Sequence, residues 1–122
     1  MKLTNVIILL LLTYFKLSAQ IDSKKYFEQS KLLSENKNYR KALSEIDNAI
    51  KLDSLNKDYL FLKMKILYNM SDCSNAILVL QKIVLIEGTL DDLTISYYAD
   101  LCDCIGESEK ATETMTEYIK YH

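Results

Sequence analysis

Thiol chemistry or a Cys/His metal site in this chain could use only Cys73, Cys102, Cys104 and His122. A structural zinc ion takes four Cys or His ligands, so a zinc site would need this whole set. A Ser-His or Cys-His pair needs a positioned histidine, and the single histidine is the last residue. The chain also lacks a glycine-rich phosphate loop. We therefore expect no catalysis, no metal and no cofactor.

The cysteines leave two further chemistries to weigh. Only one residue separates Cys102 from Cys104, and on a helix these two side chains point to different faces, which disfavours a thiol oxidoreductase. A structural disulfide requires an oxidising compartment, so it depends on whether the chain is exported.

The first twenty residues, MKLTNVIILLLLTYFKLSAQ, have the layout of a secretory signal peptide. Lys2 precedes an apolar stretch over residues 6–15, and small residues follow at Ser18 and Ala19. The pattern predicts a signal peptide over 1–19, cleavage after Ala19, and a periplasmic or secreted domain over 20–122 with no integral membrane segment. A bilayer span needs about 20 apolar residues, which this run does not reach, and an uncleaved anchor is the alternative.

Charge is spread unevenly along the predicted mature chain, which has 13 basic and 17 acidic side chains and a net charge of −4. That balance disfavours nucleic acid as a partner. Residues 20–65 carry a net charge of +3, and residues 66–122 carry −7. The asymmetry indicates either two differently solvated surfaces or electrostatic steering of a partner or of a second copy.

An internal repeat sets the expected architecture. Two glycines and no prolines favour helices, and Ala42, Ala76 and Ala111 are spaced by 34 and 35 residues. Apolar or small residues follow each alanine at offsets of four, seven and eight, which is one face of a helix. The residues that follow the alanines are Ile46, Ala49, Ile50, Leu80, Ile83, Val84, Met115, Tyr118 and Ile119. A second, mostly apolar series precedes each alanine and consists of Tyr26, Ser30, Leu33, Leu60, Met64, Leu67, Ile95, Ala99 and Cys102.

Polar and glycine residues mark where these helices should begin and end. Gly88 can close a helix in a left-handed conformation, and residues 89–92, Thr-Leu-Asp-Asp, read as a capping box for the next helix. Side chains able to cap other helix starts are Asp22, Asn38, Asn56 and Asp72. The pattern predicts three helical hairpins, over residues 23–56, 57–91 and 92–122.

This pattern resembles the tetratricopeptide repeat family across residues 23–122. The resemblance implies an all-α solenoid of three antiparallel helix-turn-helix hairpins, in which stacking buries apolar faces that one hairpin cannot bury alone. In that family small residues of the two helices face each other, which here pairs Ser30, Met64 and Ala99 with Ala42, Ala76 and Ala111. Met64 departs from the pattern, as does Ser54 where the family often has proline.

Stacked hairpins would also bring two of the cysteines together. Cys73 falls at the turn of the second hairpin, and Cys104 falls just before the equivalent turn of the third. Because these turns lie at one end of such a stack, Cys73–Cys104 is the favoured pairing if a disulfide forms. A Cys73–Cys102 disulfide and free thiols stay open.

The resemblance further implies a concave groove lined by the first helix of each hairpin. Aromatic rings beside lysines could hold a peptide by apolar contact and charge pairing. The alternative is that Phe27 and Phe61 are partly buried between hairpins and the charges are only solvated. The predicted groove residues are Phe27, Lys31, Phe61, Lys65, Tyr68, Ser96, Asp100 and Asp103.

The last predicted helix carries more apolar residues than one face can bury, so Met115, Tyr118 and Ile119 are expected to form a contact patch. This patch could join two copies in a homodimer or meet another protein. The sequence thus predicts a non-catalytic, exported interaction module that binds a protein or peptide in its groove. The alternative is an assembly subunit that makes contact through its C-terminal helix.

Overall fold

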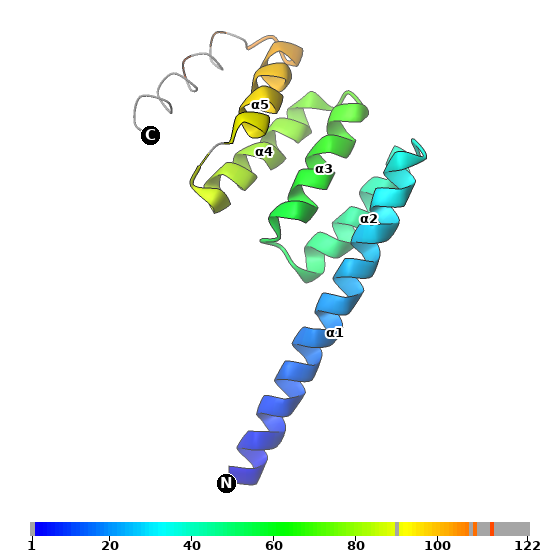
Figure 1. The fold of residues 1–122 in the computed structure, drawn as a ribbon, viewed down its shortest axis with the longest axis vertical. Coiled ribbons are helices and arrows are strands. Elements are labelled where there is room, and N and C mark those ends of the chain that lie inside the picture. The colour runs from blue at the N-terminus through cyan, green and yellow to red at the C-terminus, as the bar shows by residue number, and fades with distance from the viewer. Residues whose placement is uncertain (1, 90, 108, 110–112, 114–122) are drawn as a thin grey trace. The chain divides into compact units, whose positions relative to one another are not determined.

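The computed structural model describes residues 2–89, 91–107, 109 and 113. Within this part of the chain all regular structure is helical, with five α-helices and no strands (Figure 1). The helices are α1 (Lys2–Glu35), α2 (Tyr39–Leu52), α3 (Lys57–Asn69), α4 (Cys73–Glu87) and α5 (Asp92–Cys104). The chain divides into two compact units, residues 1–59 and 60–122, and the boundary falls inside α3.

The first unit is built around the packing of α1 on α2. Ser30 and Ala42 are both fully buried, and the Ser30 hydroxyl donates a hydrogen bond of 2.7 Å to the Ala42 carbonyl. Only small side chains allow two helices to approach so closely, as the sequence predicts for this pair. Ile46 and Ala49 continue the buried stripe of α2, at the predicted offsets of four and seven from Ala42.

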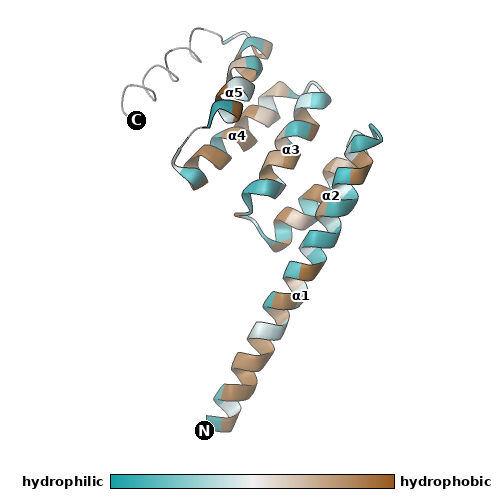
Figure 2. Ribbon diagram, viewed as in Figure 1, coloured by the Kyte–Doolittle hydropathy of each residue, from teal (hydrophilic) through white to brown (hydrophobic). Residues whose placement is uncertain are grey.

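The N-terminal half of α1 differs from the predicted boundaries. We expected Asp22 to cap a new helix, but α1 runs unbroken through it and through Ala19. The reason is local: residues 16–25 contain neither glycine nor proline to end the helix. Apolar side chains between Leu3 and Leu17 are exposed, and Figure 2 colours most of this stretch hydrophobic. By length and composition α1 is compatible with a signal sequence or a membrane span.

The second unit contains most of α3 together with α4 and α5, and α5 packs on α4. Ala76, Leu80 and Ile83 of α4 are almost completely buried, again at offsets of four and seven. Met64 is also fully buried. The larger methionine therefore occupies the core where the sequence pattern would have a small residue, which suits its flexible, adaptable side chain.

The same backbone turn occurs three times, at residues 36–38, 70–72 and 105–107. In each, the last residue's N–H reaches back five residues to a helix carbonyl, with distances of 2.8 Å from Asn38, 2.9 Å from Asp72 and 2.9 Å from Glu107. The middle residue is left-handed, with φ of 61° at Lys37, 61° at Ser71 and 77° at Gly106. This is the Schellman pattern of helix ends, and its positions reproduce the spacings of 34 and 35 residues.

Of two further helix ends predicted from the sequence, one is confirmed and one is wrong. Gly88 closes α4 in the left-handed region, as predicted. The predicted capping box beginning at Thr89 is wrong, because Asp91 is the cap of α5 and accepts a hydrogen bond of 2.7 Å from the Thr94 amide. A carboxylate at Asp91 competes with Thr89 for the cap position, and aspartate is at least as strong a cap as threonine.

Candidate functional site

Side chains of α3 and α5 form an aromatic cluster in the second unit. Phe61 and Tyr68 are seven residues apart, so they share one face of α3. Tyr97 of α5 meets both rings edge-on, with centroid distances of 5.7 Å to Phe61 and 5.5 Å to Tyr68. Edge-to-face pairs at this spacing are attractive, which fixes the rings relative to one another. All three rings are only half-buried, so each keeps surface open to a ligand.

A lysine lies beside this cluster. Lys65 is one turn from Phe61 along α3, and its ammonium nitrogen lies 5.9 Å from the centre of the Phe61 ring. The lysine is exposed. A cation over an aromatic face is held in place by the ring's electron density, yet an exposed ammonium still attracts a carboxylate. We name the surface formed by Phe61, Lys65, Tyr68 and Tyr97 the α3–α5 face.

Polar side chains of α5 adjoin the α3–α5 face. Ser96, Asp100 and Asp103 are all exposed, and their spacing of four and three residues puts them on one side of the helix. Ser96 directly precedes Tyr97 in the chain. The second unit therefore presents a lysine from α3, aromatic rings from both helices and oxygen acceptors from α5.

The two remaining predicted groove residues belong to the first unit. Phe27 is half-buried, and its ring lies 5.0 Å from that of Tyr59. The Tyr59 hydroxyl is itself 3.1 Å from the Ser23 hydroxyl, in a buried hydrogen bond. Phe27 thus helps to pack the first unit, and Phe61 is likewise half-buried against a ring in the second unit, so both aromatic residues are partly buried as in the alternative that the sequence left open. Lys31 is exposed.

Tyr97 was not among the predicted groove residues, although it joins the two helices of the α3–α5 face. The repeat alignment gives no signal for it, because the equivalent residues of the other hairpins are Glu28 and Leu62. Its role comes from a contact between α3 and α5 that occurs once, whereas alignment detects what occurs in every repeat.

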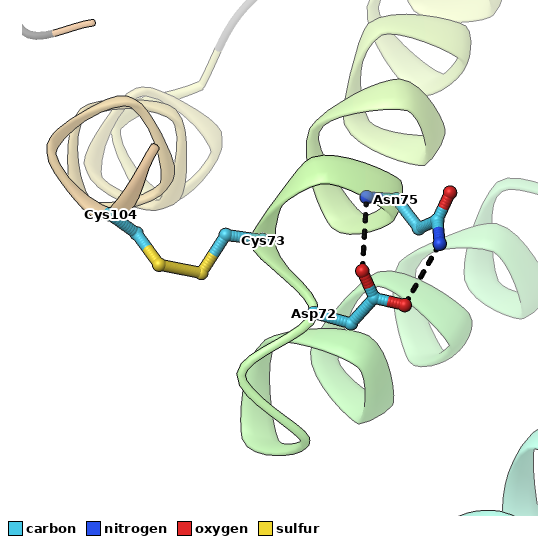
Figure 3. Close-up of a disulfide and its surroundings, with 4 residues drawn as sticks. All are labelled: Asp72, Cys73, Asn75 and Cys104. Carbon is cyan, nitrogen blue, oxygen red and sulfur yellow. Dashed lines mark hydrogen bonds between the residues drawn. A yellow bond between two sulfur atoms is a disulfide. The ribbon is translucent and has the colours of Figure 1, made fainter. Parts of the chain in front are cut away.

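The structure contains a Cys73–Cys104 disulfide, the pairing that the sequence favoured (Figure 3). It joins the first residue of α4 to the last residue of α5, with a distance of 6.2 Å between the two Cα atoms. Asp72 precedes the bridge and accepts hydrogen bonds from the backbone and side-chain amides of Asn75, which anchors the start of α4. Cys102 stays outside the bridge and is buried.

Some residues that the sequence analysis singled out cannot be placed. The contact patch of Met115, Tyr118 and Ile119 lies outside the described residues, as do Ala111 and His122. Among the residues that are described, no cluster of three His, Cys, Asp or Glu side chains has the arrangement of a metal site.

Sequence comparison assigns no family to the chain, because no protein-family model and no curated protein matches it. Its function is therefore inferred from the side chains of the α3–α5 face and from the way α5 is held.

Proposed function

We propose that this chain is a non-catalytic interaction module that binds a peptide or protein segment across the α3–α5 face. The observation that carries the proposal is the half-buried cluster of Phe61, Tyr68 and Tyr97 with the exposed Lys65 beside it. Tyrosine is among the residue types enriched at the energetic centres of binding surfaces, and a lysine beside the rings adds a charge that can steer and pair with a carboxylate.

A tetratricopeptide-like solenoid is the architecture proposed for the module. Three equivalent turns at spacings of 34 and 35 residues support a repeated hairpin. Full burial of Ala42 and Ala76, with the short bond from Ser30 to Ala42, supports close crossing of the two helices within a hairpin. In such a solenoid the first helices line the concave side, which makes α3 and α5 the binding elements.

Export to the periplasm or the cell exterior is proposed on two grounds. The N-terminal half of α1 is apolar and exposed, as in a signal sequence. A disulfide between Cys73 and Cys104 is stable in an oxidising compartment and rare in a reducing one.

The chemistry of the face favours a segment with an apolar side chain next to a carboxylate. The apolar group would lie against the exposed edges of Phe61 and Tyr97, and the carboxylate would pair with Lys65. Ser96 and Asp100 offer oxygen acceptors to backbone N–H groups of the same segment. A residue that anchors in this way typically contributes about 1–2 kcal/mol or more to binding.

A peptide-display screen against the purified, exported protein tests the proposal. We expect enrichment of peptides with an aromatic or aliphatic residue beside Asp or Glu, and calorimetry would then measure their affinity. Lys65→Glu should weaken binding at least tenfold, since it replaces attraction by repulsion. Lys82→Glu is the matched control, because Lys82 is an exposed lysine of α4, away from the face in sequence.

Phe61→Ala provides a second, uncharged variant and should weaken binding by a similar factor. Circular dichroism of each variant must show unchanged helix content for the comparison to hold. Enriched peptides that bind wild type, Lys65→Glu and Phe61→Ala equally would remove the α3–α5 face as the site.

A further inference from the structure

Two links hold the same side of α5. Tyr97 and Cys104 are seven residues apart, which is two helical turns, so both side chains lie on one face of the helix. At one position the link is aromatic, from Tyr97 to Phe61 and Tyr68 of α3. At the other it is covalent, from Cys104 to Cys73 at the start of α4.

Burial contributes comparatively little to holding α5. Its buried residues are Thr94, Leu101 and Cys102, as many as α2 buries but fewer than the five of its partner α4, and Leu93 of α5 remains 55 % exposed. Tyr97 is half-buried. A helix with so few buried side chains opens locally more readily than the core around it, unless another restraint holds it. The disulfide is such a restraint, and it acts at the far end of the face that carries Tyr97.

An external thiol can reach this restraint from one side. Cys104 is exposed at the end of α5, while Cys73 is buried with 6 % exposure. A thiolate of a dithiol reductant would attack the Cys104 sulfur and release Cys73 as a thiolate, which takes up a proton. The second thiol of the reductant then displaces Cys104 and closes the reductant's own disulfide. Two electrons and two protons pass from the dithiol to Cys73 and Cys104.

We propose that the Cys73–Cys104 disulfide is a redox latch for the α3–α5 face. When it is oxidised, α5 is held so that Tyr97 completes the aromatic cluster. When a dithiol reduces it, α5 loosens, Tyr97 leaves Phe61 and Tyr68, and the face loses its ligand. The ligand part of this inference rests on the proposed function, whereas the loosening of α5 does not.

Hydrogen exchange followed by mass spectrometry tests the latch without any ligand. The full chain is expressed in an exporting bacterial host, purified from the cell envelope, and compared before and after treatment with dithiothreitol. We expect amides of residues 92–104 to exchange at least tenfold faster after reduction. Amides of residues 39–52 in α2 and 76–83 in α4 should be unchanged. Equal exchange of residues 92–104 in the oxidised and reduced states would overturn the latch. Faster exchange of all amides after reduction would also overturn it, because the disulfide would then stabilise the whole domain and not α5 in particular.

Genetic variants give the same comparison without a reductant. The double variant Cys73→Ser/Cys104→Ser should reproduce the fast exchange of 92–104. Cys102→Ala, which puts no polar group at this buried position, is the matched control, since Cys102 shares α5 but is outside the bridge, and it should retain slow exchange of residues 92–104.

Binding is then measured with a peptide from the display screen. The latch predicts that reduction lowers its affinity at least fivefold in wild type and has no effect on the double variant. If no peptide binds even the oxidised protein, the proposed function fails while the exchange result still decides whether α5 loosens. If the peptide binds oxidised and reduced protein equally, the latch fails and the proposed function stands.

Discussion

Substitutions at Gly106 should change the free energy of unfolding differently from substitutions at Lys37 and Ser71, the equivalent residues of the other two turns. All three residues have positive φ, but Lys37 and Ser71 carry a Cβ in the left-handed region and Gly106 does not. A left-handed conformation costs a residue with a Cβ about 1–2 kcal/mol. Gly106→Ala should therefore destabilise the protein, while Lys37→Gly and Ser71→Gly should be neutral or stabilising.

The magnitude follows from two opposing effects. A Cβ built on Gly106 meets no atom within 4 Å, so no steric clash adds to the backbone cost. Replacing glycine by alanine also restricts the unfolded chain, which returns about 0.4–1 kcal/mol. The net loss for Gly106→Ala should be about 0–1.6 kcal/mol. The reverse substitutions should gain a similar amount, because glycine relieves the strain but frees the unfolded chain.

Urea unfolding monitored by circular dichroism at 222 nm measures these differences from the shift in midpoint at constant slope. In thermal unfolding, a change of 1 kcal/mol corresponds to about 4–8 °C for a domain of this size. Gly88→Ala is the matched control, since Gly88 is left-handed with φ of 69° and its Cβ would also meet no atom within 4 Å. It should cost about as much as Gly106→Ala.

Two results would refute this reasoning. A loss above about 3 kcal/mol for Gly106→Ala would mean that a packing contact, and not the backbone conformation, requires glycine there. The second result is an unchanged free energy of unfolding for Gly106→Ala together with a clear decrease for Gly88→Ala. It would mean that the turn at 105–107 does not unfold together with the rest of the domain, and the proposed third hairpin would lose its support.

Three further substitutions test the packing and the contact surfaces. Ser30→Ala removes the buried bond to the Ala42 carbonyl and should lower the free energy of unfolding by about 0.5–1.5 kcal/mol in urea titration, whereas a neutral result would show that the hydroxyl is dispensable. Ala76→Leu should cost about 1–3 kcal/mol through overpacking at a fully buried site, and an unchanged melting midpoint would contradict the close crossing of helices there. Ile119→Asp should reduce self-association or partner binding at constant helix content, with light scattering over a concentration series as the assay. A strictly monomeric wild type whose partner binding survives Ile119→Asp would exclude the patch of Met115, Tyr118 and Ile119 that the sequence predicts as a contact surface.

Features that repeat along the chain are the ones the sequence predicted well. Burial of Ala42 and Ala76, and of the residues at offsets of four and seven after them, follows from helical periodicity alone, whereas Ile50 and Val84 at offset eight are only half-buried. The favoured pairing of Cys73 with Cys104 followed from placing equivalent turns at the same end of a stack. The buried alanines and the turns each occur at least twice among the described residues, so their spacing gave a signal, and the disulfide pairing was inferred from that repeat.

The contact made by Tyr97 and the continuous course of α1, neither of which repeats along the chain, were not predicted from the sequence. Tyr97 touches Phe61 and Tyr68 through a contact between two helices that no residue spacing encodes. The start of the first hairpin was misplaced because the helix that packs on α2 continues without a break into the apolar N-terminal stretch. Nothing between Lys16 and Lys25 disfavours a helix, so α1 continues past the position where a new helix was expected.

The three turns also show which residues determine the hairpins. Lys37, Ser71 and Gly106 adopt one conformation although only glycine adopts it without cost. Two turns therefore form against a local penalty of about 1–2 kcal/mol each, which must be offset elsewhere. Close packing is the available source, since Ala42 and Ala76 are fully buried just after those two turns. At these two turns, packing of the alanine in the following helix is thus the interaction available to offset the local cost at Lys37 and Ser71. A search for turn-forming glycines would find one of the three turns, whereas the spacing of buried alanines marks both turns whose packing is described.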